Sequence, residues 1–98
     1  MKVRILPPAM QDILAAHEFY NRQEDGLGAY FLDCMFSEID SLALYAGIHA
    51  KTFGYHRLLA RRFPYGIYYD VEEMSPLVFR VLDCRRNPNW IEKQLKHE

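Results

Sequence analysis

The chain has 98 residues, of which half are hydrophobic and about a quarter are charged. This length accommodates one domain, residues 1–98, with a single modest core, and the composition excludes long disorder. Two cysteines are too few for a disulfide scaffold, and no apolar run approaches the roughly 18 residues that span a membrane. The N-terminus lacks the apolar stretch of a signal peptide, so we expect a cytoplasmic protein without membrane contact.

The net charge of −1 conceals an asymmetry between the two halves of the chain. Residues 1–49 carry three bases and seven acids, whereas residues 50–98 carry nine bases and six acids. The C-terminal half therefore either presents a basic surface to an acidic partner, or its arginines are solvated while their stems cover apolar neighbours.

The N-terminal half predicts a short strand followed by a helical hairpin. Residues 3–6 favour a strand, and the second of the two prolines that follow suits a first helical turn. A helix is predicted over residues 8–24, with Asp12 near its start and an apolar stripe that consists of Met10, Ile13, Leu14, His17 and Tyr20. Residues 25–28 predict a turn, and a second helix over residues 27–42 places Cys34 on its apolar face as a buried thiol.

The C-terminal half predicts strands over residues 56–63, 65–71 and 77–84 and a short helix over residues 90–95. Short connections favour antiparallel neighbours. The last strand is almost continuously apolar, which predicts a central strand covered on both faces, with Arg80 as the exception. The predicted class is α+β, with the order β-α-α-β-β-β and a helical hairpin packed on a small, mostly antiparallel sheet of three to four strands.

Arginines and aromatic residues of the C-terminal half are the candidate site residues, since no metal signature, phosphate-binding loop or nucleophile motif is present. Strand alternation places Arg57 and Arg61 on one face and Arg62 on the other, and antiparallel pairing would bring several guanidinium groups to one end of the sheet. Guanidinium groups bind phosphate or carboxylate. The candidate binding residues are Arg57, Arg61, Arg62, Tyr65, Tyr69, Arg80, Arg85, Arg86 and Trp90.

Each of these residues also has a structural interpretation. Arg80 would pair with Asp70 or Asp83, and the remaining arginines would be solvated. A tyrosine beside arginines either stacks a base or transfers a proton in a metal-free ribonuclease, or it packs in the core with its hydroxyl at the rim. Packing is the commoner role for a tyrosine in a β-rich segment.

Taken together, these segments resemble the RelE/ParE family of bacterial toxins from type II toxin–antitoxin modules, in particular its ParE-like, plasmid-stabilisation branch. The resemblance spans nearly the whole chain and is carried by Pro8-Ala9, Tyr20, Gly26-Leu27-Gly28, Phe31, residues 62–69, residues 78–81 and residues 85–90. It implies a helical hairpin against a small twisted sheet, no cofactor and no metal. It also implies a cognate antitoxin that covers the toxin through a flexible segment, in a toxin–antitoxin hetero-oligomer.

The family implies one of two activities. Its RelE branch cuts messenger RNA on the ribosome without a metal, whereas its ParE branch inhibits DNA gyrase and is not an enzyme. A RelE-type arginine falls near Gly66 here, and Trp90 and Ile91 stand where RelE has a tyrosine. Arg85 matches the RelE-type arginine at the end of the last strand. Of the RelE-type lysines that precede the sheet, only Lys51 has a counterpart here.

The resemblance therefore favours a growth-inhibiting toxin that binds DNA gyrase and is not an enzyme. One alternative is a ribosome-dependent, metal-free endoribonuclease that uses Arg57, Arg61, Arg80 and Arg85. The other is an inactive toxin homologue that is retained as an antitoxin-binding module.

Overall fold

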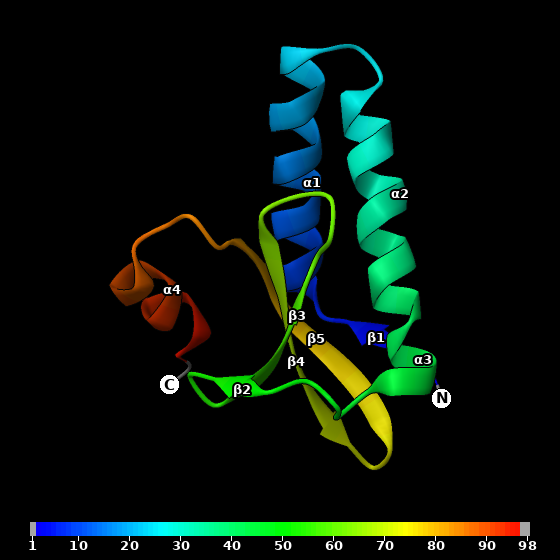
Figure 1. The fold of residues 1–98 in the computed structure, drawn as a ribbon, viewed down its shortest axis with the longest axis vertical. Helices are drawn as coiled ribbons and strands as arrows, with labels where there is room; N and C mark the ends of the chain where they lie inside the picture. The colour runs from blue at the N-terminus through cyan, green and yellow to red at the C-terminus, as the bar shows by residue number, and fades with distance from the viewer. Residues whose placement is uncertain (1, 97–98) are drawn as a thin grey trace.

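The computed structural model describes residues 2–96, which form one five-stranded sheet and its covering helices (Figure 1). The elements in chain order are β1 (Arg4–Ile5), α1 (Pro7–Gln23), α2 (Leu27–Asp40), α3 (Leu42–Tyr45), β2 (Lys51–Thr52), β3 (Tyr55–Leu59), β4 (Tyr65–Glu72), β5 (Ser75–Asp83) and α4 (Pro88–Leu95). The strand order is β1-β5-β4-β3-β2; β1 is parallel to β5, and the other pairs are antiparallel. The predicted class and the helical hairpin are confirmed, while α3 and the two-residue strand β2 were not predicted.

The helical hairpin depends on two glycines in its turn. Gly26 has a φ of +87°, a left-handed conformation that glycine adopts without steric cost. A Cβ at Gly28 would lie 2.7 Å from the carbonyl oxygen of His17, so only glycine allows α1 and α2 to approach this closely. The two helices therefore run side by side away from the turn (Figure 1).

The apolar face of α1 differs from the predicted one. The helix buries Ala9, Ile13, Ala16 and Tyr20, whereas Leu14 is 52% exposed. Two of the four buried residues are alanines, which allow the helix to pack closely against α2 and β5. The prediction overvalued large apolar residues and did not count the small ones.

The sheet has a core on each face. The core beneath α1 and α2 includes an aromatic group in which the Phe63 ring lies 4.9 Å from that of Tyr20 and 5.0 Å from that of Phe31. On the opposite face, α4 covers a smaller core that consists of Tyr55, Tyr68, Leu82, Ile91 and Leu95. The short C-terminal helix is therefore an integral part of the fold.

The strand predicted over residues 56–63 ends at Leu59, because the chain turns there to insert Phe63 between the helices. The Ala60 N–H donates to the Tyr65 carbonyl at 2.9 Å and closes this turn. Arg61 and Arg62 lie in the turn, so the prediction that they occupy opposite faces of a strand is wrong.

β5 is a central strand over only part of its length. It pairs with β1 at Leu77 and Val78 alone, so its later residues form a free edge of the sheet. The pairing of β4 with β5 has a bulge at the point where the pairing with β1 ends. The consecutive residues Tyr68 and Tyr69 pair with Arg80 and Val78, so one residue of β5 between them has no partner in β4. The prediction that β5 is covered on both faces is confirmed, since Val81 lies in the core beneath α1 and α2 and Leu82 in the core beneath α4, but the strand is flanked on both edges only at Leu77 and Val78.

Candidate functional site

A groove lies between α1, the free edge of β5 and the start of α4. Its volume is about 310 Å³, and we call it the α1–β5–α4 groove. The lining residues are Asp12, Ala15, Ala16, Phe19, Tyr65, Val81, Leu82, Asp83, Arg86 and Trp90. The groove therefore has an apolar floor between two aromatic side chains, Phe19 on α1 and Trp90 on α4.

The α4 side of the groove is built by the local sequence. The Asn87 side-chain oxygen accepts the Asn89 N–H at 2.7 Å, and Pro88 occupies the first helical turn, so α4 begins two residues earlier than predicted. This start places Trp90 in the first turn of α4, where the Arg86 guanidinium lies 3.8 Å from the centre of its ring. A stacked cation on an indole provides a flat wall that binds apolar groups and attracts negative charge.

Arg85 lies at the rim of the groove and is held by a local ion pair. Its Nε and Nη2 donate to the two carboxylate oxygens of Asp83 at 3.0 and 2.8 Å. These hydrogen bonds hold the pKa of Asp83 below its usual range and raise that of Arg85. Asp83 therefore offsets the charge of Arg85, and Arg86 remains the cation that faces the groove.

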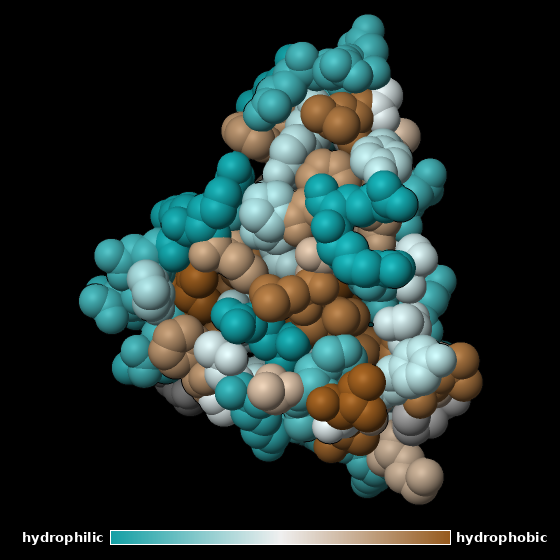
Figure 2. Space-filling view, in the orientation of Figure 1, coloured by the Kyte–Doolittle hydropathy of each residue, from teal (hydrophilic) through white to brown (hydrophobic). Residues whose placement is uncertain are grey.

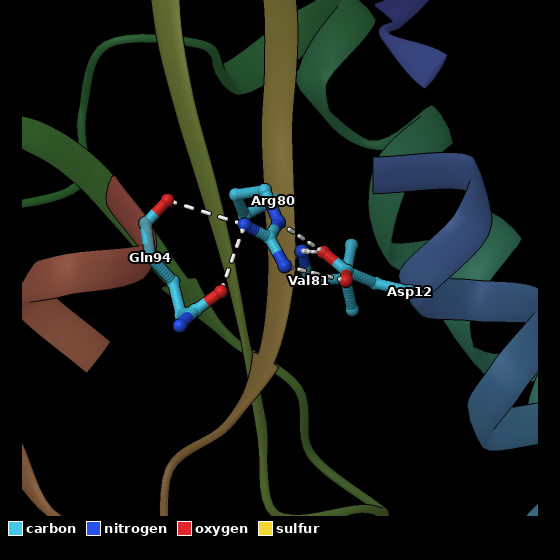
Figure 3. A network of polar contacts seen from close by, with 4 residues as sticks. All are labelled: Asp12, Arg80, Val81 and Gln94. Carbon is cyan, nitrogen blue, oxygen red and sulfur yellow. Dashed lines mark hydrogen bonds and ion pairs between the residues drawn. The ribbon is translucent and has the colours of Figure 1, made fainter. Parts of the chain in front are cut away.

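Arg80 ties three elements together at the end of the groove (Figure 3). Its Nε and Nη2 donate to Asp12 on α1 at 2.7 and 2.9 Å, and its Nη1 donates to the carbonyl and side-chain oxygens of Gln94 on α4, both at 3.2 Å. Asp12 also accepts the Val81 N–H at 3.0 Å. The prediction that Arg80 pairs with Asp70 or Asp83 is wrong, because its guanidinium binds Asp12 and Gln94 instead.

Arg61 and Arg62 belong to a different pocket of about 230 Å³, lined by Asp33, Cys34, Ser37, Glu38, Arg61 and Arg62. The buried Glu38 carboxylate accepts the Arg61 N–H at 2.8 Å and lies 3.6 Å from the Arg61 Nε. Cys34 is partly buried at the edge of this pocket and is not the fully buried thiol that was predicted.

Tyr69 is wholly buried and therefore has a packing role. Its hydroxyl accepts the Gly47 N–H at 2.9 Å and hydrogen-bonds to the Nδ1 of His49, while its ring stacks on His56. A neutral His49 ring makes this contact either by accepting the tyrosine proton or by donating to the tyrosine oxygen, according to its tautomer. Burial lowers the pKa of His49, and the nearby His56 lowers it further, in agreement with this arrangement.

Arg57 lies on the α4 face of the sheet, next to Tyr68 and Cys84. The structure thus brings Tyr65, Arg86 and Trp90 together in the groove, with Arg80 and Arg85 at its margins. Of the arginines that were expected to meet at one end of the sheet, Arg61 and Arg62 lie instead in the pocket beside α2.

Sequence reasoning missed Phe19 and Asp12 as groove residues. Phe19 is 50% exposed and falls outside the apolar stripe of α1, and an exposed aromatic residue on a helix is a signal for a contact surface. Exposed apolar side chains also occur at Leu44, Ile48 and Met74, and Figure 2 shows brown surface in the lower part of the molecule, around α3 and the β4–β5 turn.

The titratable side chains that line the groove include Asp12, Asp83 and Tyr65. Asp12 and Asp83 are paired with arginines, and burial, followed by the neighbouring Tyr20 and Asp83, raises the pKa of Tyr65. The groove therefore offers a neutral phenol and two paired carboxylates, a poor set for proton transfer near neutral pH.

In the part of the chain described, no group of three or more His, Cys, Asp or Glu side chains is placed to hold a metal ion, and no helix of residues 2–96 is long and apolar enough to cross a membrane.

Comparisons with known proteins support the fold. No family model matches the chain, and no curated protein matches it in sequence. The structure is similar to a solved chain from the chromosomal ParDE TA system of P. aeruginosa, with a TM-score of 0.69 and 17% identity over 83% of this chain and 92% of that one. The chain therefore has a ParE-like fold, as its sequence resemblance predicts.

Proposed function

We propose that this chain is the toxin of a type II toxin–antitoxin module and that a cognate antitoxin neutralises it by binding in the α1–β5–α4 groove. The observation that carries the proposal is the groove itself, with Phe19 and Trp90 as walls and Arg86 as its cation. A flexible antitoxin segment with apolar side chains and a nearby carboxylate fits these features and would fold on binding. The ParE-like fold supports this class of function.

The proposed target of the free toxin is DNA gyrase, in the cytoplasm. This proposal is supported by the positions of the arginines that the alternative, a ribonuclease, would need to bind a phosphate. Arg61 lies beside α2, Arg80 is bound by Asp12, and Arg85 is bound by Asp83, so these three do not form a phosphate clamp. Position 66 is a glycine and supplies no further cation. Binding of a protein target agrees better with this arrangement than RNA cleavage does.

Antitoxin binding is tested with the product of the adjacent open reading frame. Expression of the toxin alone should stop growth, and co-expression of that product should restore it. Phe19→Ala or Trp90→Ala should weaken binding of the purified product by tenfold or more, since buried aromatic residues dominate such interfaces. Leu14→Ala is the matched control, because Leu14 is equally exposed on α1 but does not line the groove. Groove variants that bind as tightly as the wild type would contradict the proposed site.

The target is tested separately with purified protein. Inhibition of DNA supercoiling at micromolar toxin is the expected result, and unaffected supercoiling would exclude gyrase. Codon-phased cuts in translated messenger RNA would instead indicate the RelE-type endoribonuclease. Normal growth without any antitoxin would indicate an inactive homologue.

A further inference from the structure

Three side chains meet over Gly66, on the face of the sheet that α4 partly covers. A Cβ at Gly66 would lie 3.0 Å from the Cys84 Sγ, 3.1 Å from the Tyr68 Cε1 and 3.3 Å from the Arg57 Cδ. Arg57 pairs with Tyr68 between β3 and β4, so both side chains lie on the same face. The absent side chain of Gly66 therefore provides the space in which these groups converge.

The Tyr68 hydroxyl is a buried donor without an acceptor. Tyr68 is 0% exposed, and its Oη makes no well-formed hydrogen bond among the described residues, although the Arg57 guanidinium and the Cys84 thiol lie close to it. Burial raises the pKa of Tyr68, so the hydroxyl keeps its proton near neutral pH. Such orphaned groups are rare in native proteins, because each one loses its bonds to water on folding. The position of this hydroxyl indicates a ligand group that accepts a hydrogen bond.

Arg57 is a second donor at the same place. The ion pairs found among residues 2–96 involve Arg22, Arg61, Arg80 and Arg85, and none involves Arg57. Its guanidinium lies close enough to Tyr68 and Cys84 to lower the pKa of both groups, against the larger effect of burial. Arg57 is partly exposed, so a ligand would enter from its side. A cation and a hydroxyl that both lack an acidic partner match an oxyanion.

We propose that Arg57 and Tyr68 form a receptor for one side-chain carboxylate of a protein partner. The Arg57 guanidinium binds the charge, and the Tyr68 hydroxyl donates to one carboxylate oxygen. The inference rests on the proposed function only in naming the antitoxin as the protein that supplies this carboxylate.

A carboxylate fits this site better than the phosphates of an RNA strand. A nucleic-acid backbone needs several cations along its path. Of the two arginines that follow Cys84 in the chain, Arg85 is paired with Asp83, and Arg86 faces the groove beside Trp90.

The test uses N-acetylglutamate as the probe, with N-acetylglutamine as its neutral counterpart and inorganic phosphate as the nucleic-acid surrogate. The Arg57 Nε–H signal is followed by NMR at constant ionic strength, up to about 0.1 M ligand because a single charge-assisted contact binds weakly. We expect N-acetylglutamate to shift this signal and N-acetylglutamine to leave it unchanged. No response to N-acetylglutamate, or a response to phosphate alone, would overturn the proposal.

Tyr68→Phe separates binding from a merely structural role. It should weaken N-acetylglutamate binding about tenfold, because a hydrogen bond to a charged group is lost, and at the same time raise the urea midpoint, because an unpaired buried hydroxyl is removed. Arg22→Gln, which removes an exposed charge from α1, should change neither quantity. Unchanged binding in Tyr68→Phe would refute the part given to the hydroxyl.

A final comparison separates this proposal from the proposed function. If the probe binds at Arg57 but no antitoxin binds the chain, the proposed function fails and the receptor remains. If an antitoxin binds in the groove with full affinity to both Tyr68→Phe and Arg57→Gln, antitoxin binding in the groove is supported and the Arg57–Tyr68 receptor is refuted.

Discussion

Replacement of Asp12 by alanine should be among the most damaging single changes to this fold. The carboxylate accepts three N–H groups, from the Nε and Nη2 of Arg80 at 2.7 and 2.9 Å and from Val81 at 3.0 Å. The side chains of Asp12 and Arg80 are only 15% and 22% exposed, so water replaces few of these bonds. Truncating one partner of a buried pair costs about 3–5 kcal/mol, and partial exposure places this one near the lower limit. A loss of about 3 kcal/mol lowers the Tm of a domain this size by about 12–24 °C.

Urea unfolding followed by Trp90 fluorescence measures this effect. Glu18→Ala is the control, because the Glu18–Arg22 pair on the same helix is long at 3.7 Å and mostly exposed, and its loss should cost less than about 0.5 kcal/mol. The double variant Asp12→Ala/Arg80→Met should lose less than the sum of its single variants, since the second change removes the orphaned charge. A cost below about 1 kcal/mol for Asp12→Ala, or strict additivity in the cycle, would refute the reasoning.

Three further predictions concern local features of the fold. Gly28→Ala should cost about 2–3 kcal/mol in urea unfolding, since its Cβ would lie 2.7 Å from the His17 carbonyl oxygen; a cost below about 0.5 kcal/mol would mean that the helices separate freely. As the pH falls below about 6.5, the free energy of unfolding should fall, because burial lowers the pKa of His49 and the unfolded chain takes up the proton first. That decline should be smaller in His49→Asn, and equal pH profiles would exclude His49 as its source. Asn87→Ala should cost about 1 kcal/mol and speed amide exchange in α4, whereas unchanged exchange would show that the cap is dispensable.

Local sequence was enough to predict most of the fold. The glycines at positions 26 and 28 mark the turn of the helical hairpin, and β4 and β5 follow from runs of aromatic and β-branched residues. The ends of the strands were less predictable. Phe63 continues the apolar pattern of β3, yet its ring lies between the helices, and this tertiary contact ends the strand at Leu59.

The candidate site was only partly predictable. Tyr65, Arg86 and Trp90 lie in the groove, as expected for a shared binding surface. The partner of Arg80 is Asp12, 68 positions earlier in the chain, and no local pattern predicts such a contact. The groove itself exists because β1 pairs with only two residues of β5, a length too short for sequence periodicity to reveal.

The free edge of β5 has a consequence for how this chain tells one partner from another. Two of its main-chain groups are satisfied from within, since the Val81 N–H is bound by Asp12 and the Asp83 carbonyl accepts the Arg86 N–H at 3.2 Å. A segment that adds a strand to an open edge gains affinity from its backbone whatever its sequence. Here two of those backbone groups are already occupied, so under the proposed function selectivity depends more on the side chains that fit between Phe19 and Trp90. If an antitoxin binds in the groove as proposed, a few apolar and acidic positions in each antitoxin would distinguish closely related modules in one cell.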